Sequence, residues 1–391
     1  MSANRNILLC TLLVCILLVG IANSIIGRFR PSGALMYRVY TFESLDGVTA
    51  DTTDSRRLHI PAGKYTVVAI DDPGSMDDCV SFIRKILYIN KDAYIGLSVK
   101  LFNKLAGLGN YCPQIRNLVL DVSVDDEEMP DLSALKNLIR LRIIVSLSGK
   151  KDLIKSGDVL KYRISPKEKD YLAGIVSTAC SLKNVRELVF KARYFDIDLS
   201  CLDKQQHLIK LGVSASNLVL PKDIGSIRTL VMSCMKMDDY YSKVAGYENL
   251  RELQLDLSTF PETVKMPGMP ALISLDMSYN LFSAVEFGPM PELESLNLEQ
   301  CTKLKSIKGL NLMQKLNSLN LSFTGIDNLD FIPAKNQLDN LNLANCRRIK
   351  DFSQLVKFVN LRNLDISECN IKNKQFPTGK LPPECQVIKD Q

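Results

Sequence analysis

The chain has 391 residues, of which 46% are hydrophobic and 24% are charged, a composition that is ordinary for a folded protein. Two histidines and no tryptophan make a poor set of side chains for acid–base or metal chemistry. The net charge of +6 falls entirely within the first 225 residues. This bias is too mild to predict nucleic-acid binding.

An uncharged apolar segment, ILLCTLLVCILLVGIANSII, occupies residues 7–26. Twenty apolar residues are long enough to span a bilayer as a helix. The segment also resembles a signal peptide, with small residues around Ala22 as a cleavage site. We therefore predict residues 1–26 to be a signal peptide or a transmembrane anchor, with the body secreted or membrane-anchored and facing outside the cytoplasm. Basic residues flank both ends, so the positive-inside rule leaves the orientation open.

Residues 27–75 are predicted to form a small β-rich, membrane-proximal segment, because stretches within residues 35–70 alternate or run apolar like strands. The stretch PGSMDD, at residues 73–78, resembles a turn followed by the N-cap of a helix that runs to about Leu87. We predict that residues 76–91 form a helical amino-terminal cap. His59 is interpreted as a surface strand residue rather than a ligand.

A repeating unit fills the carboxy-terminal half of the chain. One leucine recurs at steps of 21–23 residues, followed by a second leucine three residues later and an aliphatic residue two further on. The first leucines of the six units are Leu250, Leu272, Leu293, Leu316, Leu338 and Leu361. Looser copies with the same apolar spacing lie nearer the amino terminus, such as QIRNLVL at 114–120 and NLIRLRI at 137–143. We predict repeats over residues 92–374, followed by a cap or tail at 375–391.

This pattern resembles that of the leucine-rich repeat family, LxxLxLxx(N/C)xL with a period of 20–29 residues. The 22–23-residue units are similar to those of internalin-type bacterial proteins. The resemblance implies an α/β solenoid, a leucine-rich repeat horseshoe with a parallel β-sheet on its concave face. Apolar residues three apart, as at Ile349 and Phe352, predict mostly short 3₁₀ or irregular convex segments. A capping box at Ser165–Glu168 predicts one helix that runs to about Ser181.

Cysteine occupies one fixed repeat position, at Cys301, Cys346 and Cys369, where Asn280 and Thr324 stand in other units. A small side chain there can bond to backbone groups under the turn. We interpret these cysteines as packing residues, because no CxxC motif or Cys/His cluster supports a metal site. Nine cysteines lie outside the leader, and an odd count precludes complete internal pairing.

No nucleophile elbow, P-loop or zinc-binding helix motif is present, so we predict a non-catalytic protein without cofactor or metal. We expect a monomeric body that binds a protein partner through the concave strand positions. The candidate partner-binding residues are Glu252, Asp256, Asp276, Tyr279, Asn297, Glu299, Asn320, Phe323, Asn342 and Asp365. Aromatic residues are favoured at interfaces, and Tyr279 and Phe323 supply them. Because such polar residues are also common merely as solvated positions, a binding face and a passive surface remain alternatives.

A second class of function stays open, in which residues 27–91 form an enzyme or sensor module and the repeats act as its targeting arm. About 65 residues can hardly hold a catalytic core. We therefore favour the binding solenoid.

Overall fold

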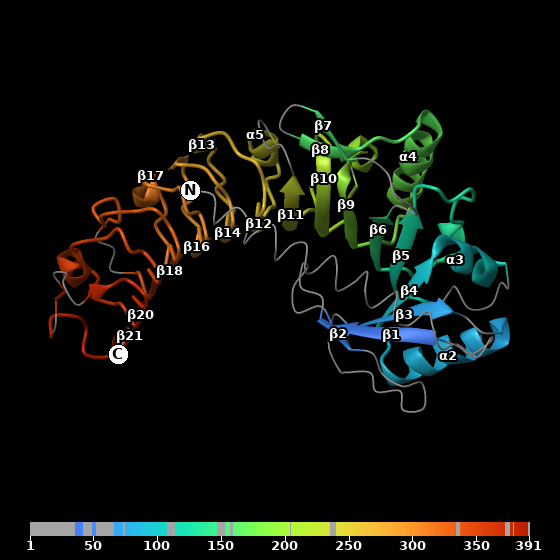
Figure 1. Cartoon of the computed structure of the whole chain (residues 1–391), viewed down its shortest axis with the longest axis horizontal. Coiled ribbons are helices and arrows are strands. Elements are labelled where there is room, and N and C mark those ends of the chain that lie inside the picture. Colours follow the sequence, from blue (N-terminus) through green and yellow to red (C-terminus); the bar gives the residue numbers. More distant parts are fainter. Residues whose placement is uncertain are drawn as a thin grey trace. The chain divides into compact units, whose positions relative to one another are not determined.

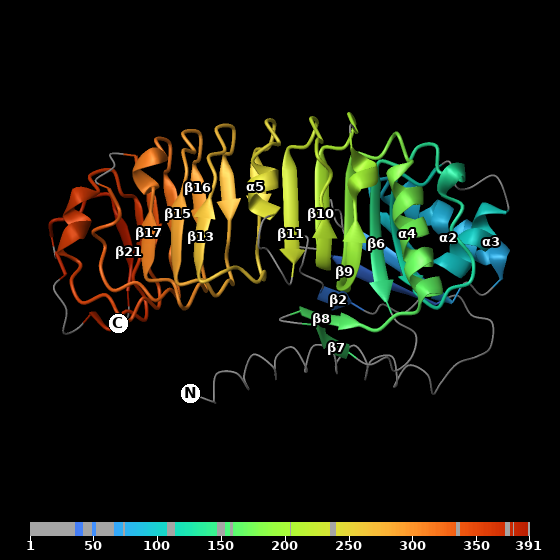
Figure 2. The same cartoon turned by 90° about the horizontal axis from the view of Figure 1, so that it is seen from above.

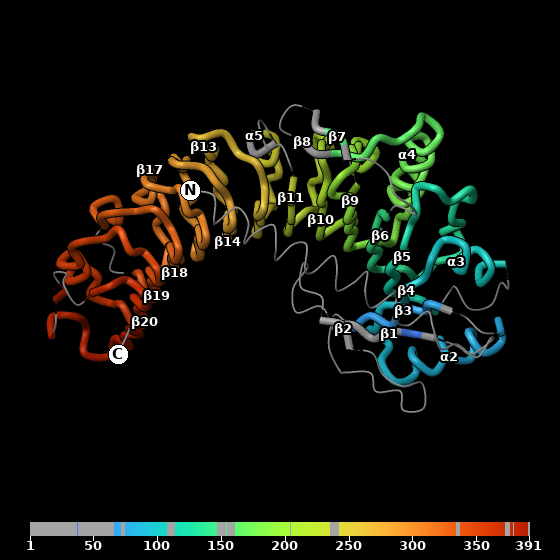
Figure 3. Tube along the Cα trace, in the orientation of Figure 1, coloured from blue at the N-terminus to red at the C-terminus, as the bar shows by residue number. Residues whose placement is uncertain are grey.

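The computed structural model forms two compact units, Met1–Leu97 and Ser98–Gln391, which are described separately (Figures 1 and 3). The predicted leader and His59 lie outside the described residues. Within the described part of the chain, no helix is long and apolar enough to cross a membrane. The described residues are 36–41, 49–51, 66–72, 75–107, 114–146, 153–156, 159–203, 205–234, 240–333, 337–371, 376–377 and 379–389.

The first unit is a small α/β arrangement. Strand β1 (Met36–Thr41) lies between β2 (Thr49–Asp51) and β3 (Thr66–Asp72) and pairs antiparallel with both. Helix α2 (Met76–Ile89) then leads to β4 (Tyr94–Ser98), which pairs parallel with β3. Strands β1, β2 and β3 therefore lie within residues 36–72, close to the stretch 35–70 in which the apolar pattern predicts strands.

Helix α2 begins where the sequence predicts. Ser75 is its N-cap, and the Ser75 Oγ accepts a hydrogen bond from the backbone N–H of Asp78 at 3.1 Å. The acidic residues in its first turn complement the helix dipole. Its buried face packs on the strands of the same unit, where the rings of Tyr37 and Phe82 lie 4.6 Å apart. The role of this helix as a cap for the repeats stays a prediction.

The second unit is built on one sheet in which all neighbouring strands are parallel. Figure 1 shows its strands along the concave side of this unit. The predicted leucine-rich repeat solenoid with a parallel concave sheet is thereby confirmed. In sheet order the strands are β5 (Asn117–Ser123), β6 (Arg140–Ser146), β9 (Glu187–Asp198), β10 (Lys210–Val219), β11 (Thr229–Cys234), β12 (Glu252–Gln254), β14 (Ser274–Asp276), β16 (Ser295–Asn297), β18 (Ser318–Asn320), β19 (Asn340–Asn342), β20 (Asn363–Asp365) and β21 (Gln386–Ile388).

The core of this unit follows directly from the repeat pattern. The central leucines of successive strands pair in register and are only 1–2% exposed. No single repeat can bury this apolar face, so the stack supplies one continuous core in which each repeat contacts its neighbours. These leucines are Leu253, Leu275, Leu296, Leu319, Leu341 and Leu364.

The segments that return from one strand to the next are mostly short, as predicted. They include α3 (Val99–Ala106), η2 (Leu132–Ala134), η3 (Ser200–Leu202), α5 (Tyr240–Val244), η4 (Leu310–Leu312) and η5 (Ser353–Lys357). A second parallel sheet, which the sequence pattern does not predict, joins β13 (Thr263–Met266), β15 (Ala284–Phe287) and β17 (Ser306–Lys308). Gly309 comes directly after it at φ +89°, and a Cβ there would lie 2.2 Å from the Phe287 carbonyl oxygen.

One long insertion interrupts the repeats between β6 and β9. It consists of an antiparallel hairpin, β7 (Leu153–Ser156) and β8 (Val159–Tyr162), and helix α4 (Pro166–Cys180). The predicted capping box is present, because Ser165 and Glu168 exchange side-chain-to-backbone hydrogen bonds at 2.6 and 3.3 Å. A disulfide between Cys180 and Cys201, which the sequence did not identify, joins the end of α4 to η3.

Candidate functional site

From β12 to β20 the concave side of the sheet is polar and lacks basic residues. Side chains alternate along each strand, so the residues on either side of a buried leucine face outward. None of these outward residues is lysine or arginine. Carboxylates come from Glu252, Asp276, Glu299 and Asp365. This part of the face is therefore acidic.

Five of the candidate residues each commit one side-chain oxygen to their own backbone. The Oδ1 of each accepts a hydrogen bond, 2.9–3.1 Å long, from the backbone N–H two residues further on. Such Asx turns end the strands and lead the chain into the next segment. The five residues are Asp276, Asn297, Asn320, Asn342 and Asp365. They have a structural role whether or not a partner binds.

Amide groups of the next repeat hold two of the acidic side chains in place. Asn297 Nδ2 donates to Asp276 Oδ2 at 3.1 Å, and Asn320 Nδ2 donates to Glu299 Oε2 at 3.2 Å. Within the described part of the chain, Glu252, Asp276 and Glu299 form no ion pair with a lysine or arginine. The carboxylates of Asp276 and Glu299 are thus positioned by neutral donors.

Each repeat from β12 to β20 also contains a residue with a left-handed backbone just after the strand. These residues form what we call the ridge: Leu257, Tyr279, Gln300, Phe323, Asn345 and Glu368, with φ between 49° and 62°. Apart from Asn345, they are of types that rarely adopt this conformation. The backbone N–H groups of Tyr279 and Phe323 donate to carbonyls of the next repeat at 2.8 Å, which holds them there.

The two predicted aromatic residues lie on this ridge, at the end of the strands. Tyr279 is 51% exposed and Phe323 is 38% exposed. Burial raises the pKa of the Tyr279 phenol, and the charges of Glu299, Asp276 and Asp256 raise it further. Carboxylates from three successive repeats therefore act electrostatically on one accessible aromatic side chain.

Asp256 differs from the other candidates. It was expected on the solvated face, but it is only 7% exposed, so that expectation is wrong. Ser258, two residues further on, is also buried, and its Oγ donates to the Asp256 carbonyl at 3.1 Å. Glu252 is exposed as predicted, and Asp276 and Glu299 are half-buried.

The fixed cysteine position has the predicted packing role. Cys301, Cys346 and Cys369 are fully buried, and each thiol donates to a carbonyl of the preceding repeat at 3.0–3.2 Å. Asn280, at the same position, donates to two carbonyls and accepts from the Ser258 N–H, each at 2.8 Å. Burial raises the pKa of Cys301 to about 12, so this thiol stays protonated and is a poor nucleophile.

Further along the same face, β18 to β21 border a shallow hollow of about 280 Å³. Three candidate residues, Asn320, Asn342 and Asp365, line it. The structure thus brings these three together, while Glu252, Asp276, Tyr279 and Glu299 gather over the preceding strands.

The concave face from β5 to β11 is of another kind. It carries Arg140, Lys191 and Lys210, and Arg140 pairs with Glu187 at 3.1 Å. Val119 and Val189 occupy strand positions on this concave face, but neighbouring side chains cover them and they are buried. The acidic surface therefore belongs to the carboxy-terminal repeats.

Comparison with known proteins supports the repeat assignment. Residues 308–381 match a family described as Zer-1-like leucine-rich repeats. Together with the repeating strands, this match confirms the prediction of leucine-rich repeats. No curated protein sequence matches the chain.

Several solved structures are similar to the chain. One is an internalin, InlF, of Listeria monocytogenes strain 4b F2365, at 13% identity and a TM-score of 0.37, covering 76% of this chain and 85% of that one. The functional domain of InlJ from Listeria monocytogenes is 12% identical, with a TM-score of 0.32, covering 72% and 64%. A leucine-rich repeat protein of Leptospira interrogans is 16% identical, with a TM-score of 0.30, covering 73% and 98%.

Proposed function

Because the chain carries leucine-rich repeats, we propose that it binds a protein partner through the acidic concave surface around Tyr279, without catalysing a reaction. The observation that carries the proposal is that amides of the next repeat fix two carboxylates, Asp276 and Glu299, on the face that also presents the exposed Tyr279 ring. The acidic concave surface is defined by Glu252, Asp276, Tyr279 and Glu299.

The chemistry of this surface favours a basic partner. Neighbouring strands lie about 4.8 Å apart, so the carboxylates act together within one Debye length of about 8–10 Å. A lysine or arginine side chain can pair with Asp276 or Glu299 and lie against the face of the Tyr279 ring. Association should accelerate at low salt, because complementary charge steers the encounter.

Variants that remove charge while keeping the Asx turn test the acidic concave surface, although Asp276→Asn gives up the oxygen that accepts from Asn297 Nδ2. Asp276→Asn keeps the oxygen that accepts from the Ser278 N–H, whereas a lysine there would break the Asx turn. The test variant combines Asp276→Asn with Glu252→Gln and Glu299→Gln. Its matched control, Glu248→Gln with Glu286→Gln and Asp327→Asn, changes the net charge equally at exposed positions away from this surface.

Proteins captured by the native chain and the control, but lost from the test variant, are the expected result. With such a partner, the association rate of the native chain should fall as salt rises, with a weaker dependence for the test variant. Equal capture by all three proteins would show that the acidic concave surface is passive and would overturn the proposal.

The export of the protein is a further part of this proposal and rests on the apolar segment at residues 7–26. We propose that this segment either anchors the body outside the cytoplasm or is cleaved during secretion. Deletion of residues 1–26 should leave the protein soluble in the cytoplasm. Fractionation of the deleted protein with membranes would contradict the assignment of this segment as the anchor.

A further inference from the structure

The insertion between β6 and β9 creates a site that ordinary repeats lack. Helix α4 packs against β9 and η3, and β8 packs against β9 and β10. Figure 2 shows the hairpin β7–β8 beside the ends of these strands. Strands β9 and β10, with 12 and 10 residues, are much longer than those of the later repeats. Insertions in repeat proteins lie on one face, which is often the binding face.

Strand β9 carries a bulge at this point. Ala192 pairs with Ala215 and Asp196 pairs with Asn217, so β9 has two more residues than β10 between these pairs. The buried Ser216 hydroxyl donates to the Arg193 carbonyl at 3.1 Å, which holds the bulge. Bulges redirect side chains and are frequent next to functional sites.

The bulge brings aromatic side chains of β9 against the hairpin. The Tyr194 ring lies edge-on to the Tyr162 ring of β8, with 5.2 Å between centroids. Phe195, the next residue, lies 5.7 Å from the same Tyr162 ring. These contacts attach β8 to β9 and close one side of a cavity.

The cavity has a volume of about 740 Å³, within the range of sites that hold small molecules, roughly 300–1,000 Å³. Its apolar lining comes from Leu172 and Val176 of α4, Phe195 and Ile197 of β9, and Ile164. The Cys180–Cys201 disulfide joins α4 to η3 at its border and keeps the two walls together in the absence of a ligand.

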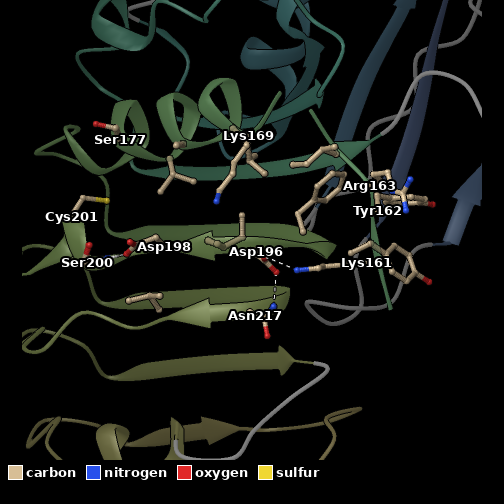
Figure 4. A pocket seen from close by; sticks show the side chains of 18 of the residues that line it. Lys161, Tyr162, Arg163, Lys169, Ser177, Asp196, Asp198, Ser200, Cys201 and Asn217 are labelled. Atoms are coloured by element: carbon tan, nitrogen blue, oxygen red, sulfur yellow. Dashed lines mark hydrogen bonds and ion pairs between the residues drawn. The ribbon is translucent and has the colours of Figure 1, made fainter. Parts of the chain in front are cut away.

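Three cationic side chains line the same cavity (Figure 4). Lys161 is compensated, because it pairs with Asp196 at 3.3 Å, and Asp196 also accepts from Asn217 at 2.7 Å. Within the described part of the chain, the side chains of Arg163 and Lys169 have no hydrogen-bond or ion-pair partner. Figure 4 shows the Lys169 ammonium group directed from α4 toward β9.

One acidic side chain besides Asp196 lines the cavity, and it is already engaged. Asp198 Oδ1 accepts a hydrogen bond from the Ser200 N–H at 2.9 Å. The lining therefore carries three positive and two negative charges. An apolar cavity with exposed, unpaired cations at its edge favours a ligand with an apolar body and an anionic head group.

We propose that this cavity binds a small amphipathic anion, of the class of a medium-chain carboxylate or alkyl phosphate. The apolar chain lies between α4 and β9, against Leu172, Val176 and Phe195. Lys169, which is directed from α4 toward β9, holds the anionic head group. This site is independent of the acidic concave surface proposed to bind a protein.

The test uses the full chain, kept free of detergent, and a photoreactive dodecanoate whose attachment sites are mapped by mass spectrometry. Labelling is expected on α4 and on the bulged part of β9. Unlabelled dodecanoate or dodecyl phosphate should displace the probe, and the better of the two identifies the head group. Dodecanol, which lacks the charge, should need about tenfold more, a difference of roughly 1.4 kcal/mol.

Three variants sharpen the test. Lys169→Gln should weaken displacement by dodecanoate about tenfold, an effect expected for loss of one charge-assisted contact. Lys183→Gln removes a nearby exposed charge outside the cavity and should leave it unchanged. Val176→Trp should fill the cavity and abolish labelling, with circular dichroism checking the fold. Labelling spread over the surface, equal displacement by dodecanol, or equal effects of the two lysine variants would overturn the proposal.

Discussion

The solenoid has two parts that hold their strands in different ways. From β5 to β11 the strands have 6–12 residues, a helix and a disulfide support them, and the concave face carries basic side chains. From β12 to β20 each strand of the concave sheet has three residues and the concave face is acidic. Long strands provide many ladder hydrogen bonds, whereas three-residue strands depend on the turns that end them.

The turn after each short strand is built in the same way in nearly every repeat. An Asx turn ends the strand, a left-handed residue comes next, and a buried Asn, Thr or Cys bonds to carbonyls beneath the turn. These local requirements explain why the sequence is strictly periodic here. In the first part, longer-range contacts share the same task, so the sequence repeats only loosely.

The largest effect should come from the core of the second part. Leu296→Ala or Leu341→Ala should lower the free energy of unfolding by about 2–5 kcal/mol, because each leaves a cavity between two repeats. Denaturant unfolding monitored by circular dichroism measures it. Leu281→Ala is the matched control, since Leu281 is 61% exposed, and it should cost less than about 0.5 kcal/mol. A loss below about 1 kcal/mol at both core positions would contradict the register.

The first part should depend on its disulfide. Replacing Cys180 and Cys201 together with alanine removes a cross-link between residues 21 positions apart and should cost about 3 kcal/mol. Hydrogen exchange should then accelerate in α4 and η3 but not in β14–β20. Uniform acceleration along the solenoid would show that the two parts unfold as one.

A smaller effect is expected at the position beneath the turns. Asn280→Ala leaves two buried carbonyls and the Ser258 N–H without this partner and should cost about 1–3 kcal/mol. Cys346→Ser keeps a donor for the Leu321 carbonyl and should cost less than about 1 kcal/mol. Thermal unfolding of both variants gives the comparison. If Cys346→Ser lowered the stability more than Asn280→Ala, hydrogen bonding would not be the main contribution of this position.

The smallest effect should be a gain in stability. Gln300 has φ 59°, so Gln300→Gly should relieve backbone strain and stabilise the fold by up to about 1 kcal/mol. In the first part, no described residue other than glycine has a positive φ. Lys191→Gly in β9 should therefore destabilise the protein by about 0.5–1 kcal/mol. Calorimetry measures whether each variant is more or less stable than the native chain. If both glycine variants changed stability in the same direction, the two parts would not differ in backbone strain.

The sequence predicted the features that short-range patterns encode. The leucine period predicted the parallel sheet, the Ser165–Glu168 capping box predicted α4, and the shared position of Cys301 and Asn280 predicted a packing role. The ridge was missed as a backbone feature because residues such as Tyr279 do not normally adopt positive φ. Among the ridge residues, only Asn345 is of a type that commonly adopts a left-handed backbone.

Features that depend on packing between distant segments were not predicted. The second sheet uses strands of three or four residues, too short for a clear alternation around Val264 or Val285. The repeat pattern places Asp256 on the solvated face and does not reveal that it is buried. The cavity arises from a hairpin, a helix and a bulge that share no motif. Export, the protein partner and the domain boundaries stay predictions.

The in-register stacking also determines how the protein should respond to force. A repeat that contacts only its neighbours can be peeled from the end of the stack without disturbing the rest. Pulling on the carboxy terminus should release repeats one at a time, each adding about 75 Å of extended chain for roughly 22 residues. The extension should be shorter where the Cys180–Cys201 cross-link withholds the residues between the two cysteines. The extension gained with each released repeat would therefore differ between the carboxy-terminal repeats and the cross-linked part of the solenoid.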